Sequence, residues 1–280
     1  MNTTLHPPAR VTQTRSPLTR FGWTIADTWI MTRRDLAHWR LRPGTAILGW
    51  FFPVMIVLMF GFLFGGAISV PGGGNYFEFL MPGMFATTML FGLETTMIAV
   101  TTDASKGVTD RFRSLPMSAS AVVLGRCLAD LVNSMIGLAI LIGVGLMLGW
   151  RWHGGLSSAL TAVGLLLLLR FALLWVGIFC GLKARGPESV TSVQILVWPI
   201  SFLSNVFVDP STMPPWLGIV AQWNPLSATA GATRNLFMNP GWQMGSWISE
   251  HAGLMAVVYS VLLIALFLPL SVRIYRRLSR

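Results

Sequence analysis

The sequence is poor in charged residues and rich in apolar ones, which bounds the class of protein. Charged residues make up 11% of its 280 residues and hydrophobic residues make up 54%. Soluble domains carry about 25% charged residues. Together with a mean hydropathy of +0.65, this composition excludes an ordinary soluble domain and indicates a single integral membrane domain.

The motifs of nucleotide hydrolysis, nucleophilic catalysis and metal binding are also missing. The sequence has no G-x-x-x-x-G-K-[ST] phosphate loop and no G-x-S-x-G elbow, and its only lysines are Lys106 and Lys183. The four histidines lack metal-ligand spacing; they are His6, His38, His153 and His251. We therefore expect no catalytic, cofactor-binding or metal-binding residues, and no enzyme activity from this chain by itself.

Cysteine is scarce, and the N-terminal region does not have the pattern of a signal peptide. Cys127 and Cys180 form no C-x-x-C pair, so we interpret them as small packing residues rather than as a disulfide. Residues 1–22 are polar and contain no apolar core of signal-peptide length. We expect no cleaved signal and a disordered cytoplasmic tail over these residues.

Six apolar segments follow, and about 20 residues are needed to cross the hydrocarbon layer. They predict an all-α integral membrane fold with six transmembrane helices, in one domain over residues 23–280. The spans are expected at about 44–68, 79–102, 119–150, 155–182, 189–208 and 252–272. The moderately apolar stretch 217–237 is excluded as a seventh span because Asn224, Pro225 and Arg234 interrupt it.

The net charge of +10 would suggest nucleic-acid binding in a soluble protein, but here the positions of the charges indicate membrane topology. Seventeen of the 20 basic residues fall on one side of the expected spans. Only Arg151 and Arg234 fall on the other side, and Arg170 lies within a span. Because positive charge marks the cytoplasmic side, we predict cytoplasmic N- and C-termini and no nucleic-acid partner.

A basic amphipathic helix is expected over residues 23–40, before the first span. The segment combines the apolar residues Ile25, Trp29 and Ile30 with the basic residues Arg33, Arg34 and Arg40. Such a helix lies in the headgroup plane, in contact with membrane lipid. A solvated linker is the alternative interpretation.

The segment between the last two spans, residues 209–250, is too long for a plain turn. Pro214-Pro215 and Asn224-Pro225 can each open a short helix, because proline is tolerated in the first helical turn. Irregular backbone that enters the membrane has to be buried in protein or wet. Two readings remain open, namely short helices that re-enter the outer leaflet and interfacial helices in an outer loop.

Two charged residues fall inside the expected spans. Glu94 and Arg170 would each cost about 2.5–3.5 kcal/mol if they faced lipid, so they face protein or water. They either form a buried ion pair or lie on a substrate path, where Glu94 would attract cationic amphiphiles. Arg126 and Asp130 are four residues apart, and we interpret them as a pair on one helix face.

The longest charged interruption between apolar segments covers residues 101–130. Within it, residues 108–115 have the pattern of a short amphipathic helix, with Val108, Phe112 and Leu115 on one face. This pattern fits a helix that docks on another protein. It also fits a solvated loop bound to lipid headgroups through its arginines.

Two runs of sequence carry a resemblance to a known family. Residues 110–131 read DRFRSLPMSASAVVLGRCLADL, and residues 207–237 contain MPPWL followed by NPL. Both runs resemble the ABC-2 type transporter permeases, most of all the daunorubicin and doxorubicin resistance branch. The resemblance extends over residues 33–277.

That resemblance implies a coupling helix that docks in a groove of a separate ATPase. Its docking residues would be Val108, Asp110, Arg111, Phe112, Arg113 and Leu115. It also implies an elbow helix before the first span and two short helices that dip into the outer leaflet before the last one. The expected complex contains two permeases, identical or different, and two ATPases, which hold ATP and magnesium.

The expected function is that of the membrane-spanning permease subunit of an ABC exporter in a bacterial plasma membrane. Its cargo would be amphipathic drugs or lipids, with a lipid-linked polysaccharide as the alternative. An ion-coupled secondary transporter would need inverted repeats and more intramembrane carboxylates than Glu94 alone. A membrane-embedded enzyme would need a catalytic cluster.

Overall fold

The computed structural model describes residues 28–29, 32–33, 43–66, 70, 75–105, 119–184, 186–242 and 245–278, and every element in these ranges is a helix. The long helices are α2 (Pro43–Phe64), α3 (Tyr76–Ser105), α5 (Ala119–Met147), α6 (Leu156–Lys183), α7 (Pro187–Phe202) and α11 (Ala252–Leu278). The short ones are η1 (Pro210–Thr212), α8 (Pro215–Gln222), α9 (Pro225–Phe237) and α10 (Trp247–Glu250).

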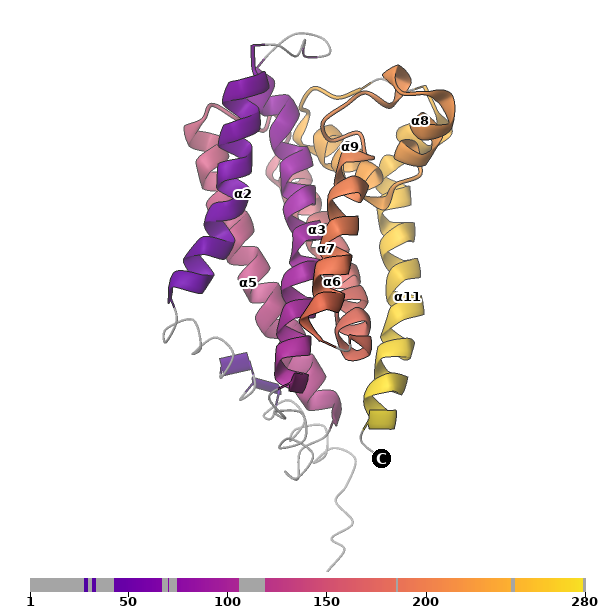
Figure 1. Ribbon diagram of the computed structural model, residues 1–280. Coiled ribbons are helices and arrows are strands. Elements are labelled where there is room, and N and C mark those ends of the chain that lie inside the picture. The colour runs from indigo at the N-terminus through magenta and orange to yellow at the C-terminus, as the bar shows by residue number, and fades with distance from the viewer. Residues whose placement is uncertain are drawn as a thin grey trace, which may run out of the picture.

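The long helices run side by side, and the short helices gather at one end of the bundle (Figure 1). The end of α11 lies at the opposite end (Figure 1). Helix α3 is central, since it contacts α2, α5, α6, α7 and α9. Because neighbours surround it, much of α3 is buried, and Phe79, Met84 and Phe85 have no exposed surface.

Two glycines let α6 pack directly against α3. A Cβ atom on Gly177 would lie 2.8 Å from the carbonyl oxygen of Leu93, and one on Gly181 would lie 2.7 Å from the Val100 side chain. Glycines four residues apart allow this close approach of membrane helices. The α3–α6 pair therefore forms a tightly packed centre, with the other helices around it.

Five helices in the described ranges are long and apolar enough to cross a membrane. These segments are Ile47–Phe64, Tyr76–Ser105, Leu124–Met147, Leu156–Lys183 and Ala252–Tyr275. They correspond to five of the six spans predicted from the sequence. The all-helical, multi-pass membrane architecture is thereby confirmed.

The remaining expected span, 189–208, is wrong at its C-terminal end, because α7 stops at Phe202 after 16 residues. A helix of this length is about 24 Å long, less than the ~30 Å hydrocarbon layer. The Asn224 side chain is responsible for this ending. Its Nδ2 donates to the carbonyl oxygens of Ile200 and Leu203, at 2.8 and 2.6 Å, and so satisfies carbonyls at the end of α7.

The short helices begin at the prolines that the sequence pattern indicated. Helix α8 starts at Pro215 and α9 starts at Pro225, with Asn224 capping the N–H of Leu226 at 2.9 Å. The helical structure is interrupted between α8 and α9. Residues 217–237 are therefore not a seventh span, as predicted.

Several expected features lie outside the described residues. These are the tail 1–22 and the proposed coupling segment 108–115. Of the elbow segment 23–40, only residues 28–29 and 32–33 are described, and they are helical. The Thr32 hydroxyl donates to the carbonyl oxygen of Gly125 at 3.1 Å, so this part of the chain packs against the beginning of α5.

Candidate functional site

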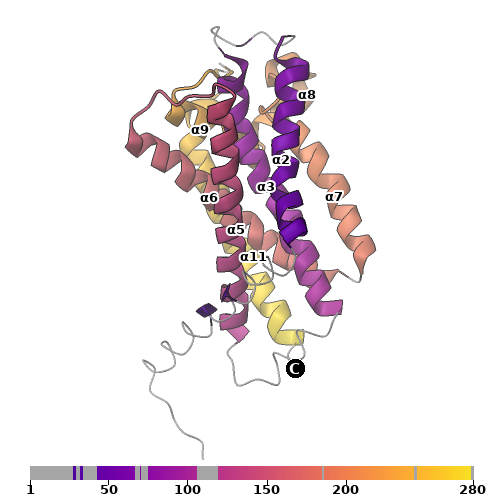
Figure 2. The same ribbon diagram turned by 90° about the vertical axis from the view of Figure 1, so that its left-hand side faces the viewer.

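A cavity of about 710 Å³ lies between α2, α3, α5 and α7. Figure 2 faces the side of the bundle where α2, α3 and α7 lie next to one another. The volume falls within the range of about 300–1,000 Å³ that small-molecule sites occupy. Among the described residues that line the cavity, Glu94 is the only charged one. The others are apolar or polar and uncharged.

Three aromatic side chains from three helices form one wall of this cavity. They are Phe52 of α2, Phe91 of α3 and Trp198 of α7. The ring centroids lie 5.8 Å apart for Phe52 and Phe91, 6.2 Å for Phe52 and Trp198, and 5.1 Å for Phe91 and Trp198. These tilted and edge-on arrangements are favoured by aromatic pairs, so the three rings hold the helices together around the cavity.

Glu94 is half-buried and extends from α3 towards α7. Its Oε2 accepts a hydrogen bond from Nε2 of Gln194 at 3.3 Å. Its Oε1 is buried and has no hydrogen-bond partner among the described residues. On the other side of the cavity, Trp50 of α2 donates from Nε1 to Oδ1 of Asn133 of α5 at 2.9 Å.

Arg170 lies beside the cavity, in a polar network buried between α3, α5 and α6. Only 1% of the residue is exposed. Its Nε donates to the hydroxyl of Ser134 at 2.7 Å, and one terminal nitrogen donates to the hydroxyl of Thr96 at 2.8 Å. The same nitrogen lies 3.8 Å from Oδ2 of Asp130, which also accepts from Thr96 at 2.8 Å. Gly92 leaves space for the guanidinium, since a Cβ there would lie 2.6 Å from Nε.

The structure thus places the two intramembrane charges with different partners. Glu94 contacts Gln194, whereas Arg170 contacts Asp130. Arg126, which the sequence analysis paired with Asp130, forms an ion pair with Asp103 of α3. Sequence reasoning missed Thr96, Ser134 and Gln194, because uncharged polar residues are common in membrane helices. Asp130 was the available signal, since it is a carboxylate within the third expected span, 119–150.

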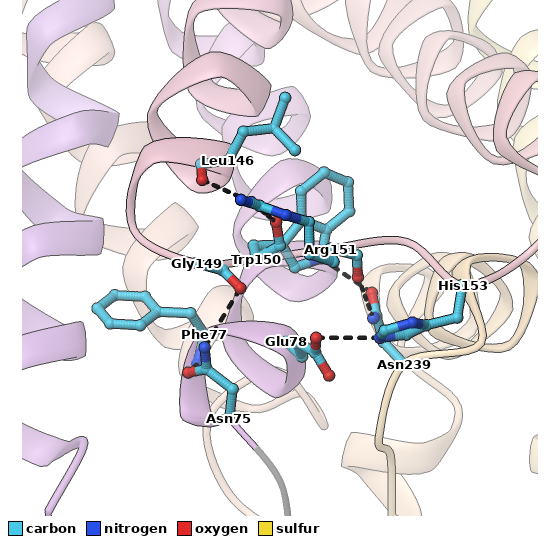
Figure 3. Close-up of polar contacts among 9 residues, drawn as sticks. All are labelled: Asn75, Phe77, Glu78, Leu146, Gly149, Trp150, Arg151, His153 and Asn239. Atoms are coloured by element: carbon cyan, nitrogen blue, oxygen red, sulfur yellow. Dashed lines mark hydrogen bonds and ion pairs between the residues drawn. The ribbon is translucent and has the colours of Figure 1, made fainter.

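A second polar cluster ties the α5–α6 connection to α3 and to Asn239, the second residue after α9 (Figure 3). Trp150 is 1% exposed and donates from Nε1 to Oδ1 of Asn239 at 2.9 Å, and Nδ2 of Asn239 donates to the carbonyl oxygen of Arg151 at 2.8 Å. His153 Nε2 lies 3.0 Å from Oε1 of Glu78 (Figure 3). These contacts fix the connection at this end of the bundle, so we interpret the cluster as structural.

Arg234 of α9 is a buried cation held by backbone carbonyls. Its three nitrogens donate to the carbonyl oxygens of Phe79, Asn205 and Val206, at 3.1, 3.0 and 3.0 Å. The guanidinium carbon also lies 4.4 Å from the centroid of the Phe79 ring, within range of a cation–π contact. Arg234 therefore stabilises the irregular backbone that follows α7. The sequence analysis had not indicated this role of Arg234.

In the described ranges, no group of three or more His, Cys, Asp and Glu side chains is placed to hold a metal ion. The site consists of a mostly apolar cavity with one carboxylate, next to a buried charged network in a bundle of membrane-crossing helices. These features define a multi-pass helical membrane protein with a ligand-sized cavity between its helices.

The chain belongs to the ABC-2 type transporter family, whose sequence profile matches residues 26–238. It is 35% identical over 227 residues to the daunorubicin resistance ABC transporter permease protein DrrB1 of Streptomyces coeruleorubidus. That alignment covers 80% of this chain and 77% of the relative. The resemblance found in the sequence is confirmed.

Two more distant relatives align over most of both chains. A probable doxorubicin resistance ABC transporter permease protein, DrrC of Mycobacterium tuberculosis, is 21% identical over 91% of this chain and 90% of its own. The putative transport permease ycf38 of Cyanophora paradoxa is 23% identical over 86% of this chain and 84% of its own. Members of this family are permease subunits that work with ATP-binding subunits.

Proposed function

We propose that this chain is the membrane-spanning subunit of an ABC exporter that moves amphipathic drugs or lipids out of a bacterial cell. The observation that carries the proposal is the 35% identity, over 80% of the chain, to a relative named for daunorubicin resistance. The cavity supports it, since a largely apolar space of about 710 Å³ with few polar groups suits an amphipathic cargo.

Energy would come from a separate ATPase that holds ATP and magnesium. Its docking site on this chain would be residues 108–115, which connect the end of α3 to the start of α5. Phe112 and Leu115 would supply the apolar anchor, and Arg111 would make charge-assisted hydrogen bonds to the ATPase. A docked helix at this point would transmit movement of the ATPase to α3 and α5, which both line the cavity.

The proposed topology has six spans, with α7 as the short fifth span and with both termini in the cytoplasm. The bias of basic residues supports this orientation. It places the α8–α10 end outside the cell or in the outer leaflet, as short re-entrant helices.

Two permease subunits and two ATPases would form the working complex. Helices α2 and α7 expose large apolar side chains, including those of Phe51, Met55, Phe62, Ile195 and Leu196. These side chains suit contact with lipid or with a second permease subunit, identical or different, next to the cavity.

Transport by inverted membrane vesicles tests the proposal. The chain is expressed together with a candidate partner ABC ATPase from the same organism, and uptake of daunorubicin is followed by fluorescence. We expect uptake that requires ATP and both proteins. Equal uptake without the permease, or without ATP, would refute the proposed function.

A further inference from the structure

We propose that the cavity between α2, α3, α5 and α7 binds aromatic monocations, with Glu94 as the counter-charge and the Phe52–Phe91–Trp198 rings as the stacking wall. This inference rests on the proposed function, because it names the class of cargo that the permease accepts. It selects, among amphipathic molecules, those with a flat aromatic body and an amine or other cationic nitrogen close to it.

The charge distribution of the cavity carries the first step. Glu94 is the only charged residue among the described residues that line it. One oxygen of this carboxylate accepts from Gln194, and the other is buried without a hydrogen-bond partner in the described part of the chain. A buried, unpartnered acceptor is costly, and a donor that carries positive charge relieves this cost best. A ligand ammonium group would supply such a donor.

The helix register carries the second step. Phe91 and Glu94 are three residues apart on α3, and Trp198 and Gln194 are four residues apart on α7, so each pair lies on one helix face. The Glu94–Gln194 hydrogen bond and the Phe91–Trp198 ring contact are therefore successive layers between these two helices. One helical turn, about 5 Å, separates the layers. A ligand that spans both layers places its cationic nitrogen about one ring width from its aromatic system.

The rings favour the same sign of charge as the carboxylate. The faces of Phe and Trp side chains carry negative charge density, which attracts cations. They also stack with flat aromatic molecules. Both layers of the cavity therefore discriminate against anions and in favour of aromatic cations.

The nearby arginine does not reverse this preference. Arg170 is 1% exposed and lies against Asp130, Thr96 and Ser134. Ser134 and Gly92 line the cavity, whereas Arg170 does not. The positive charge of Arg170 is thus partnered by Asp130 outside the cavity lining, and Glu94 sets the sign of charge inside it.

A matched pair of probes tests the inference by binding alone. The ammonium form of 1-pyrenemethylamine and neutral 1-pyrenemethanol share the same ring system and differ in charge. The purified permease is placed in lipid nanodiscs, and binding is measured by energy transfer from tryptophan to pyrene, with empty nanodiscs as background. We expect the ammonium probe to bind about tenfold more tightly than the alcohol.

Four variants, one of them a control, locate the source of the preference. Glu94→Gln should bind both probes with similar affinity, Glu94→Asp should retain the preference for the ammonium probe, and Glu250→Gln, a change at an exposed site on α10, should behave like the wild type. Phe91→Leu should weaken binding of both probes, because it removes one ring from the wall. Each variant is first shown to elute as a single species with the wild-type elution volume.

Two outcomes would overturn the inference. One is equal affinity of the wild type for the two probes, and the other is a charge preference that survives Glu94→Gln. Neither depends on ATP or on the ATPase. A permease that binds the ammonium probe through Glu94 but shows no ATP-dependent uptake would keep this inference and refute the proposed function. A complex that shows ATP-dependent uptake but no binding of the ammonium probe through Glu94 would keep the proposed function and refute this inference.

Discussion

At the scale of single residues, Arg170 shows how a positive charge is held inside a membrane-crossing helix. A guanidinium that faces lipid costs about 2.5–3.5 kcal/mol or more. Here Asp130 of α5, Thr96 of α3 and Ser134 of α5 surround it within hydrogen-bond or ion-pair distance. The contacts of the Arg170 side chain therefore connect α3, α5 and α6, and the charge does not face lipid.

Removing either charge of this pair alone should destabilise the protein. Arg170→Met leaves the partly buried Asp130 with fewer partners, and Asp130→Asn leaves the buried Arg170 without a counter-charge. Breaking a buried pair on one side costs about 3–5 kcal/mol. Both single variants should unfold at lower temperature in detergent, measured by fluorescence-detected size-exclusion chromatography after heating. The double variant should recover part of the loss.

Glu250→Gln serves as the control for this series, because it removes a carboxylate from an exposed position. Single variants as heat-resistant as this control would show that the network does not stabilise the bundle.

At the scale of elements, the end of α7 depends on side chains from a later part of the chain. Asn224 satisfies two of its carbonyls, and Arg234 binds the carbonyls of Asn205 and Val206 directly after it. Non-helical backbone at membrane depth is tolerated only when it is buried in protein or lines a wet space. Asn224 and Arg234 meet that requirement for the non-helical backbone at the end of α7.

Arg234→Lys should loosen this segment while keeping the charge. A lysine presents one compact ammonium and lacks the planar fork that reaches three carbonyl oxygens. Each unsatisfied buried carbonyl costs about 1–3 kcal/mol. We expect a lower midpoint of thermal unfolding than in Arg273→Lys, a matched change at an exposed arginine of α11. Identical midpoints for the two variants would contradict this role of Arg234.

The extent to which the elements follow from sequence differs even between elements that contact one another. The starts of α8 and α9 were predictable, because Pro215 and Pro225 act through local backbone geometry. The end of α7 was not, since it is determined by Asn224, more than 20 residues further along the chain. The same reason explains the intramembrane charges. Apolar periodicity places Arg170 in a helix, but only tertiary packing brings Asp130 to it.

The proposed coupling segment, residues 108–115, leads to a prediction for the same scale. Phe112→Ala should weaken association with the ATPase by about 2 kcal/mol or more, because it truncates the central apolar anchor. Arg111→Glu should have a similar effect through lost charge-assisted hydrogen bonds. Co-purification of a tagged ATPase with the permease measures both.

Ser114→Ala, which lies in the same segment off its apolar face, is the control and should co-purify normally. Wild-type association and transport for both Phe112→Ala and Arg111→Glu would identify this segment as a loop bound to headgroups.

At the scale of the whole molecule, the bundle has one crowded centre and outer helices with exposed apolar side chains. Helix α3 packs closely on α6, while α2 and α7 leave large apolar side chains exposed. The short helices occupy the end opposite the C-terminus (Figure 1). This asymmetry fits a subunit that completes its transport pathway together with other subunits.

The proposed orientation predicts opposite labelling of two engineered cysteines. In a background without Cys127 and Cys180, Ser211→Cys lies on the exposed 3-10 turn before α8 and should react with an impermeant maleimide in intact cells. Ser118→Cys should react only after the membrane is permeabilised. Labelling of both positions in intact cells would mean that the orientation is wrong.

The partners of Arg170 also have an order along the chain, and this order matters while the protein is being made. Thr96, Asp130 and Ser134 all precede Arg170. Chains enter the membrane from the N-terminus during synthesis, so these partners have already left the ribosome when the arginine arrives. Its insertion should therefore depend on the helices made before it. A ribosome-bound fragment that begins after α5 would have to place the same arginine in the bilayer without them.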